Sequence, residues 1–131
     1  MLDITYNGVT LAYIGDAVIE LYIREALIAS GITDTGRLSA AAQKLVCAKT
    51  QSEIAERIQP MLSPEEEAAY KLGRNHHVTG KPKHASVAQY SRATGLEAIF
   101  GYLQLCGNKD RLKTLLDEAY TSPLAELRDN L

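Results

Sequence analysis

The chain has 131 residues, of which 46% are hydrophobic and 23% are charged, and its formal net charge at pH 7 is −2. These values are typical of one globular domain, here expected over residues 1–131, that buries a sizeable core without disulfide staples. No apolar run approaches the ~18 residues that a membrane span requires, so the composition excludes a membrane protein.

The first predicted helix carries one apolar stripe and ends near residue 30. The stripe consists of Leu11, Ile14, Val18, Leu21 and Ile28. Its spacings of three, four, three and seven residues keep these side chains on one face of an α-helix. Gly31 is the expected stop signal of this helix.

Further helices follow in chain order, most of them marked by capping residues. Thr33 or Asp34 caps a segment that runs to about residue 46, and another helix spans residues 50–58. Ser63 precedes a proline and three glutamates, which is a strong helix start. After a long loop over residues 73–86, helices are predicted over residues 87–105 and from residue 109 to about residue 120 or past Pro123. No strand pattern of useful length is present, so the predicted fold class is all-α, a helical bundle.

The two cysteines, Cys47 and Cys106, stand alone in apolar contexts and lack the paired spacing of a metal site. Isolated cysteines of this kind are typical of buried free thiols. Free thiols fit a reducing cytosol, so we expect a cytoplasmic protein.

The charge is distributed unevenly along the chain. From residue 68 to residue 96 there is no Asp or Glu, so this stretch is +5 with neutral histidines, while the remainder is −7. A local basic stretch is what phosphate contact requires, and a solvated loop is the alternative. Its cations are Lys71, Arg74, Lys81, Lys83 and Arg92, and its histidines are His76, His77 and His84.

Two acidic residues, Asp16 and Glu97, lie inside otherwise apolar, helix-patterned segments. A carboxylate among apolar neighbours is unfavourable unless something compensates its charge. A divalent cation shared by both acids would do so, because such ions bind hard oxygen ligands. The alternatives are an ion pair between Asp16 and a cation such as Arg92, and a solvated helix position for Glu97.

Three segments, taken in order, resemble the ribonuclease III family. Residues 13–20, YIGDAVIE, resemble its signature helix, and residues 95–105, GLEAIFGYLQL, resemble its other catalytic helix. Residues 45–55 are similar to its middle segment. The resemblance covers residues 9–120 and is closest to mini-ribonuclease III, the short members without a double-stranded-RNA-binding domain. The 26 residues after Leu105 are too few for that domain.

The resemblance implies a metal-dependent endoribonuclease that cleaves double-stranded regions of structured RNA and leaves 5′-phosphate and 3′-hydroxyl ends. It implies that Asp16 and Glu97 are catalytic residues and ligands of Mg²⁺ or Mn²⁺. Glu20 is either an outer ligand or half of a surface salt bridge. Ala12 and Thr94 replace two acids of full-length relatives, so the ligand set is reduced.

The resemblance further implies a homodimer that matures a ribosomal RNA precursor, particularly that of the large subunit. Contacts to RNA are expected from Lys71, Arg74, Asn75, Lys81, Lys83 and Arg92. The apolar faces expected to support a dimer consist of Ile14, Val18, Tyr22, Leu96, Phe100 and Leu103. The alternatives are a non-catalytic ribonuclease III-like scaffold that binds RNA at the ribosome, and a plain helical dimerisation module.

Overall fold

Six α-helices account for most of the described chain. The computed structural model describes residues 6–76 and 85–130. In chain order its elements are α1 (Gly8–Ala29), α2 (Thr35–Val46), α3 (Ala48–Ile58), the 3₁₀ turn η1 (Gln59–Met61), α4 (Pro64–Arg74), α5 (Val87–Leu105) and α6 (Lys109–Asp129). No strand occurs within the two described ranges, which confirms the predicted all-α class. None of the described helices combines the length and the apolar character that crossing a membrane requires.

The helix starts follow the capping residues of the sequence. Asp34, and not Thr33, caps α2, because its side chain accepts a hydrogen bond from the backbone N–H of Arg37 at 2.9 Å. Ser63 begins α4 with a capping box, as predicted. Gly31 follows α1 with φ of 105°, in the left-handed region that favours glycine.

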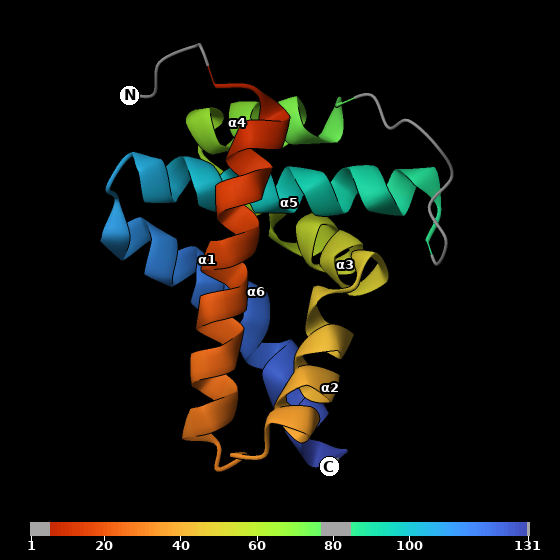
Figure 1. Cartoon of the computed structure of the whole chain (residues 1–131). Helices are drawn as coiled ribbons and strands as arrows, with labels where there is room; N and C mark the ends of the chain where they lie inside the picture. The colour runs from red at the N-terminus through yellow and green to blue at the C-terminus, as the bar shows by residue number, and fades with distance from the viewer. Residues whose placement is uncertain (1–5, 77–84, 131) are drawn as a thin grey trace.

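Helix α5 is the central element of the bundle. In Figure 1 it runs across the molecule behind α1, with α4 on one side and α3 and α6 on the other. It contacts all four of these helices. The middle of the core therefore combines α5 with its neighbours and includes Leu96, Ile99, Phe100 and Leu103 with Ile19, Ile23, Leu115 and Tyr120.

The buried face of α1 differs from the predicted stripe. Leu11 is buried, but Leu21 and Ile28 are 61% and 55% exposed. The row that faces the core consists of Leu11, Gly15, Ile19, Ile23 and Leu27. Apolar residues occupy both faces of α1, so periodicity alone could not decide which face packs against α5 and α6. The predicted stripe is therefore wrong for its C-terminal half.

The apolar faces expected to support a dimer are also largely interior. Leu96, Phe100 and Leu103 are at most 2% exposed and belong to the core of the single chain. Val18 and Tyr22 are half-buried and pack against the same core. These residues complete a monomer core, so they cannot serve as the argument for a dimer.

The prediction of two buried thiols is wrong. Cys47 is half-buried and Cys106 is exposed, and both are free. Each caps the C-terminus of a helix, Cys47 that of α2 and Cys106 that of α5. Helix ends lie nearer to the surface than helix centres, which accounts for the difference.

A buried ion pair ties α4 to α6. Glu66 is only 3% exposed. Its carboxylate accepts hydrogen bonds from Nε and Nη2 of Arg111, both at 2.9 Å, and from the backbone N–H of Ser63 at 2.9 Å. Burial acts to raise the pKa of Glu66, but these hydrogen bonds outweigh it and hold the pKa below its usual value. Protein groups alone therefore compensate this acid.

Helix α6 continues past Pro123 because another helix supplies a hydrogen-bond donor. Proline has no backbone N–H, so the carbonyl of Ala119, four residues earlier, has no donor within its own helix. Arg57 of α3 donates from Nη2 to this oxygen at 2.6 Å and from Nη1 to the carbonyl oxygen of Glu118 at 2.8 Å. The helix therefore reaches Asp129 with the carbonyl of Ala119 satisfied.

Glycines let α1, α4 and α5 touch through their main chains. A Cβ at Gly8 of α1 would overlap the carbonyl oxygen of Leu72 on α4. A Cβ at Gly73 of α4 would lie 2.7 Å from the carbonyl oxygen of Thr94 on α5. Both positions lack room for any side chain, so the three helices are held at backbone contact on this side of the bundle.

Candidate active site

Helices α1 and α5 cross through two reciprocal glycine contacts. Gly15 of α1 lies against the backbone of Glu97, and a Cβ there would overlap the Glu97 carbonyl oxygen. Gly101 of α5 lies against α1, and a Cβ there would overlap the Leu11 carbonyl oxygen. A larger residue at either position would separate the helices. The two glycines therefore set the spacing of the helices that carry the predicted site acids.

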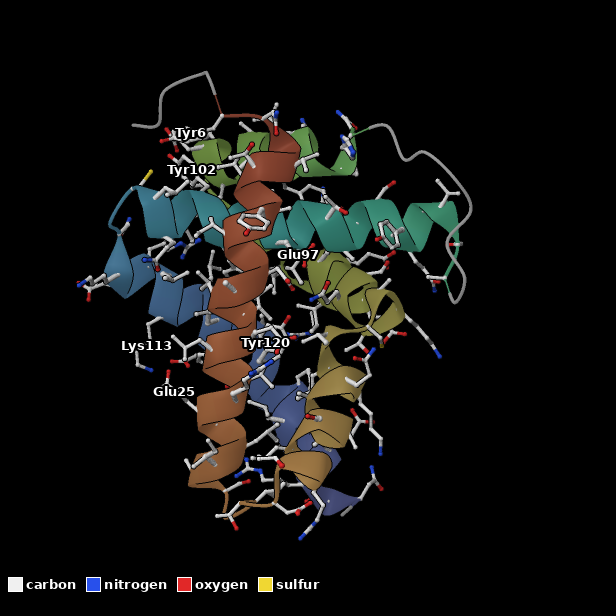
Figure 2. All side chains as sticks on the ribbon, in the orientation of Figure 1. Tyr6, Glu25, Glu97, Tyr102, Lys113 and Tyr120 are labelled. Carbon is white, nitrogen blue, oxygen red and sulfur yellow. The ribbon has the colours of Figure 1, made fainter. Side chains whose placement is uncertain are left out.

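The crossing brings these acids together. Asp16 directly follows Gly15, and its carboxylate is within hydrogen-bonding range of the Glu97 carboxylate on α5. Glu97 is half-buried near the crossing of α1 and α5 (Figure 2), whereas Asp16 is exposed. The expectation that both acids lie in apolar surroundings is therefore wrong for Asp16, because Gly15 occupies the inward position beside it.

The two carboxylates face each other, and no cation of residues 6–76 and 85–130 pairs with either of them. Burial, followed by the hydrogen bond and the negative charge of Asp16, raises the pKa of Glu97 to about 8. Neither acid takes part in a salt bridge within the described residues. Arg92, the expected partner of Asp16, instead lies 3.1 Å from Glu56 and donates to the Ser52 hydroxyl at 3.3 Å. The ion-pair alternative for Asp16 is therefore wrong for Arg92 and for the other cations that the structure describes.

Glu20 lies one turn beyond Asp16 on α1. Its carboxylate forms a salt bridge with Arg24, with 3.1 Å between Oε2 and Nε. This i,i+4 pair is the surface salt bridge that the sequence offered as one of two interpretations. The other interpretation, an outer metal ligand, stays a prediction.

The donor set fits a small, hard divalent cation. Two facing carboxylates supply hard oxygen ligands, and a cation would relieve the repulsion between them. Over residues 6–76 and 85–130 there is no group of three or more His, Cys, Asp or Glu that could hold a metal ion. Mg²⁺ suits so small a set because it usually keeps several of its waters.

The positions of the two missing acids are filled by other contacts. Ala12 is buried, with 7% of its surface exposed. The hydroxyl of Thr94 donates a hydrogen bond to the carbonyl oxygen of Tyr90 within α5 at 3.0 Å. Neither position contributes a carboxylate, so Asp16 and Glu97 are the acids that the site offers a metal in this part of the chain.

Two buried polar side chains lie behind Glu97. Gln51 of α3 and Glu97 line the same small pocket, together with Val46, Ala48, Tyr90, Ala93 and Thr94. The hydroxyl of Tyr120 on α6 lies beside Gln51, and the negative charge of Glu97 acts to raise the pKa of this hydroxyl. The sequence marked neither residue as functional. Gln51 falls in the middle segment of the family resemblance, which was the one available signal, and Tyr120 carried none.

The predicted RNA-binding residues occupy more than one place. Lys71, Arg74 and Asn75 lie at the C-terminal end of α4, and the Arg74 guanidinium stacks 5.6 Å from the centre of the Tyr70 ring. Arg92 lies on α5 beside Glu56, as described above. Outside the described residues lie Lys81 and Lys83, with His77 and His84.

Comparisons with known proteins identify the family. A family model described as the ribonuclease III domain matches residues 9–108. The chain is 40% identical over 119 residues to the mini-ribonuclease 3 of Streptococcus pneumoniae, covering 88% of this chain and 93% of that protein. It is 42% identical over 113 residues to that of Enterococcus faecalis, covering 85% and 86%.

A solved structure agrees with this result. The crystal structure of a Fusobacterium nucleatum protein matches with a TM-score of 0.82 and 31% identity, covering 90% of this chain and 96% of that chain. The family predicted from the three motif segments and the all-α fold are therefore confirmed. On these grounds the chain belongs to the ribonuclease III family of endoribonucleases.

Proposed function

We propose that the chain is a Mg²⁺-dependent endoribonuclease that cleaves double-stranded regions of structured RNA, with Asp16 and Glu97 as its catalytic metal ligands. Family membership supplies the reaction class. The assignment of residues is carried by one observation, the facing pair of carboxylates that no cation of the described residues compensates. Mn²⁺ is the alternative ion.

The two acids have different tasks in this proposal. Glu97 is half-buried against the backbone crossing, so it anchors the ion, while the exposed Asp16 binds from the side that RNA approaches. When bound, the ion activates a water molecule and stabilises the charge that develops on the phosphoryl and leaving oxygens. Both acids then serve as ligands and not as proton carriers. The expected products carry 5′-phosphate and 3′-hydroxyl ends.

The proposed substrate is a ribosomal RNA precursor, particularly that of the large subunit, and the proposed location is the cytoplasm. Both follow from the resemblance to short members of the family. Duplex RNA is bound mainly through phosphates, 2′-hydroxyls and shape. The cations assigned to phosphate contact are Lys71, Arg74, Lys81, Lys83 and Arg92, with hydrogen bonds from Asn75.

A homodimer is part of the proposal, with a different face from the one that the sequence indicated. Tyr13, Leu21 and Ile28 on the outer side of α1 are 82%, 61% and 55% exposed. Exposed apolar patches mark interaction surfaces, so these side chains are the candidate dimer surface. An isologous pair formed through α1 would place two sites, one for each RNA strand, on a common groove.

Substitution of Asp16 tests the proposed site. Asp16→Asn is expected to lower kcat on a duplex RNA with Mg²⁺ by about 10³-fold or more, because a metal ligand supports several kcal/mol of transition-state stabilisation. Glu25→Gln is the matched control, since it removes another exposed acid of α1 and should leave kcat unchanged. Cleavage that survives Asp16→Asn would contradict the assignment. A wild-type protein that binds duplex RNA without cutting it would favour the non-catalytic scaffold.

The basic stretch has its own test in the salt dependence of RNA binding. The double substitution Lys81→Gln and Lys83→Gln should reduce the slope of log affinity against log salt concentration by about 1–2, because each phosphate contact releases counterions. The measurement is a titration of a catalytically inactive Asp16→Asn protein with duplex RNA at several salt concentrations. An unchanged slope would remove these two lysines from the interface.

A further inference from the structure

Two polar groups behind Glu97 have no role in the function proposed above. Tyr120 is fully buried, and Gln51 is 2% exposed. The Tyr120 hydroxyl and the Gln51 Nε2 have no hydrogen-bond partner among the described residues. Groups of this kind are rare in folded proteins, because burial removes their bonds to water. Two of them side by side therefore require an explanation.

The two groups converge on the inner side of the candidate site. Gln51 and Glu97 line one small pocket between α3 and α5. The Tyr120 hydroxyl lies beside the Gln51 amide, and among nearby acids Glu97 exerts the largest charge effect on it. Figure 2 labels both side chains, Tyr120 from α6 and Glu97 from α5. The ring of Tyr120 is held in place by the core and by Tyr22, whose ring centre lies 6.2 Å away.

We propose that Tyr120, oriented by Gln51, is a positioning residue for the metal ligand Glu97. The Gln51 amide donates to the hydroxyl oxygen of Tyr120, and the hydroxyl donates to a water molecule that in turn donates to the Glu97 carboxylate. This arrangement satisfies both orphaned groups. It also directs the remaining lone pairs of Glu97 toward Asp16, where the cation would lie. The inference rests on the proposed role of Glu97 as a ligand.

The arrangement has a physical rationale in metal chemistry. Hydrogen bonds to a ligand fix its orientation, and loss of such a bond typically weakens metal affinity 10–100-fold. A buried hydroxyl that merely filled space would have the opposite signature. Its removal would leave metal binding unchanged and would not destabilise the fold, because no hydrogen bond is lost.

Metal affinity of the full chain tests the inference without reference to cleavage. Mn²⁺ is the probe, and electron paramagnetic resonance measures the free ion during titration. Tyr120→Phe is expected to weaken Mn²⁺ binding about 10-fold and to lower the melting temperature, because the hydrogen bonds of the hydroxyl are lost. Glu97→Gln should abolish binding at this site.

Tyr70→Phe is the matched control. Tyr70 is also buried, at 2% exposure, and packs against Gly95 of α5. The charges that act on its hydroxyl come from Arg74, Arg92, Glu67 and Glu56, and not from the site acids. Tyr70→Phe should therefore bind Mn²⁺ as the wild type does.

A double-mutant cycle tests the role of Gln51. Gln51→Met preserves volume and removes the amide, so it should weaken Mn²⁺ binding on its own. Because Gln51 acts through Tyr120, the double variant should bind no more weakly than Tyr120→Phe alone. If the losses of Mn²⁺ affinity from the two substitutions were fully additive, the proposal that Gln51 acts through Tyr120 would be overturned.

The outcomes separate this inference from the function on which it rests. If Tyr120→Phe binds Mn²⁺ as tightly as the wild type while Glu97→Gln abolishes binding, the positioning role is overturned and the proposed metal site stands. If the wild type binds no Mn²⁺ that depends on Glu97, the proposed metal site fails and the positioning role fails with it.

Discussion

Replacement of Glu97 by glutamine is expected to abolish cleavage and, at the same time, to stabilise the metal-free protein. Glutamine keeps the shape of the side chain but removes a half-buried negative charge that faces Asp16. The loss of activity follows from the loss of a ligand. The gain in stability follows because two facing carboxylates repel each other when no cation lies between them.

The gain in stability is expected to increase with pH. Burial and Asp16 raise the pKa of Glu97 to about 8 in the folded protein, while a value near ~4.3 is ordinary for the unfolded chain. Between these two values the folded state holds a proton that the unfolded state has released, so the free energy of unfolding falls as pH rises. Glu97→Gln escapes this penalty. It should match the wild type near pH 4 and exceed it by about 2–4 kcal/mol at pH 8.5.

Thermal unfolding at several pH values, with and without Mg²⁺, measures both effects. Mg²⁺ should stabilise the wild type and leave Glu97→Gln unchanged, because only the wild type retains the ligand pair. Glu66→Gln is the matched control with the opposite sign, since Glu66 is compensated by Arg111 and its replacement should destabilise the protein at every pH above its pKa. A Glu97→Gln variant less stable than the wild type at pH 8.5 without metal would contradict the charge argument.

Substitution of Gly15 by alanine is expected to have the largest effect on folding. A Cβ at this position overlaps the carbonyl oxygen of Glu97, which belongs to the main chain and cannot rotate away. Alanine is the better helix former by about 1 kcal/mol, but overpacking against backbone outweighs that gain. We expect a loss of about 3 kcal/mol or more in the free energy of unfolding, measured by urea denaturation. Cleavage should fall as well, because Asp16 moves away from Glu97.

Gly36→Ala is the matched control for this substitution. Gly36 lies in α2, where the nearest atom to a Cβ would be Oδ2 of Asp34, at 3.3 Å, a side-chain oxygen that caps the helix and can shift slightly, and not a main-chain atom. Alanine there should be neutral or stabilising by up to about 1 kcal/mol. Gly101→Ala should reproduce the effect of Gly15→Ala, because it meets the Leu11 carbonyl oxygen from the other side of the crossing. If Gly15→Ala had the same free energy of unfolding as the wild type, the helices could separate without loss of stability, and the packing argument would be wrong.

The sequence predicted most helix boundaries because local chemistry determines them. Capping residues such as Ser63 and Asp34 act within one turn, so their effect can be read without knowing the tertiary structure. The inward face of α1 could not be predicted with the same success. It depends on where α5 crosses, and the crossing is determined by Gly15 and Gly101, which carry no hydrophobic signal.

The sequence was enough to predict the two acids of the candidate site, but it did not predict the residues that surround them. Asp16 and Glu97 were identified by motif resemblance, and the fold brings them together. Their neighbours come from helices far apart in the sequence, so no local pattern marked Gln51 or Tyr120. Glu66 is buried although it lies in a run of three glutamates, and its compensator is Arg111 on a distant helix and not a metal.

The glycine contacts of Gly8 and Gly73 fix the distances between helices α1, α4 and α5 on one side of the bundle. Because α1, α4 and α5 touch main chain to main chain there, rotamer changes cannot alter the interval between the end of α4 and the Asp16–Glu97 pair. If Lys71 or Arg74 binds a duplex phosphate as proposed, the backbone that carries this side chain would lie at a constant distance from the proposed metal site. Adjustment to the shape of the RNA would then be limited to these side chains and to the RNA itself.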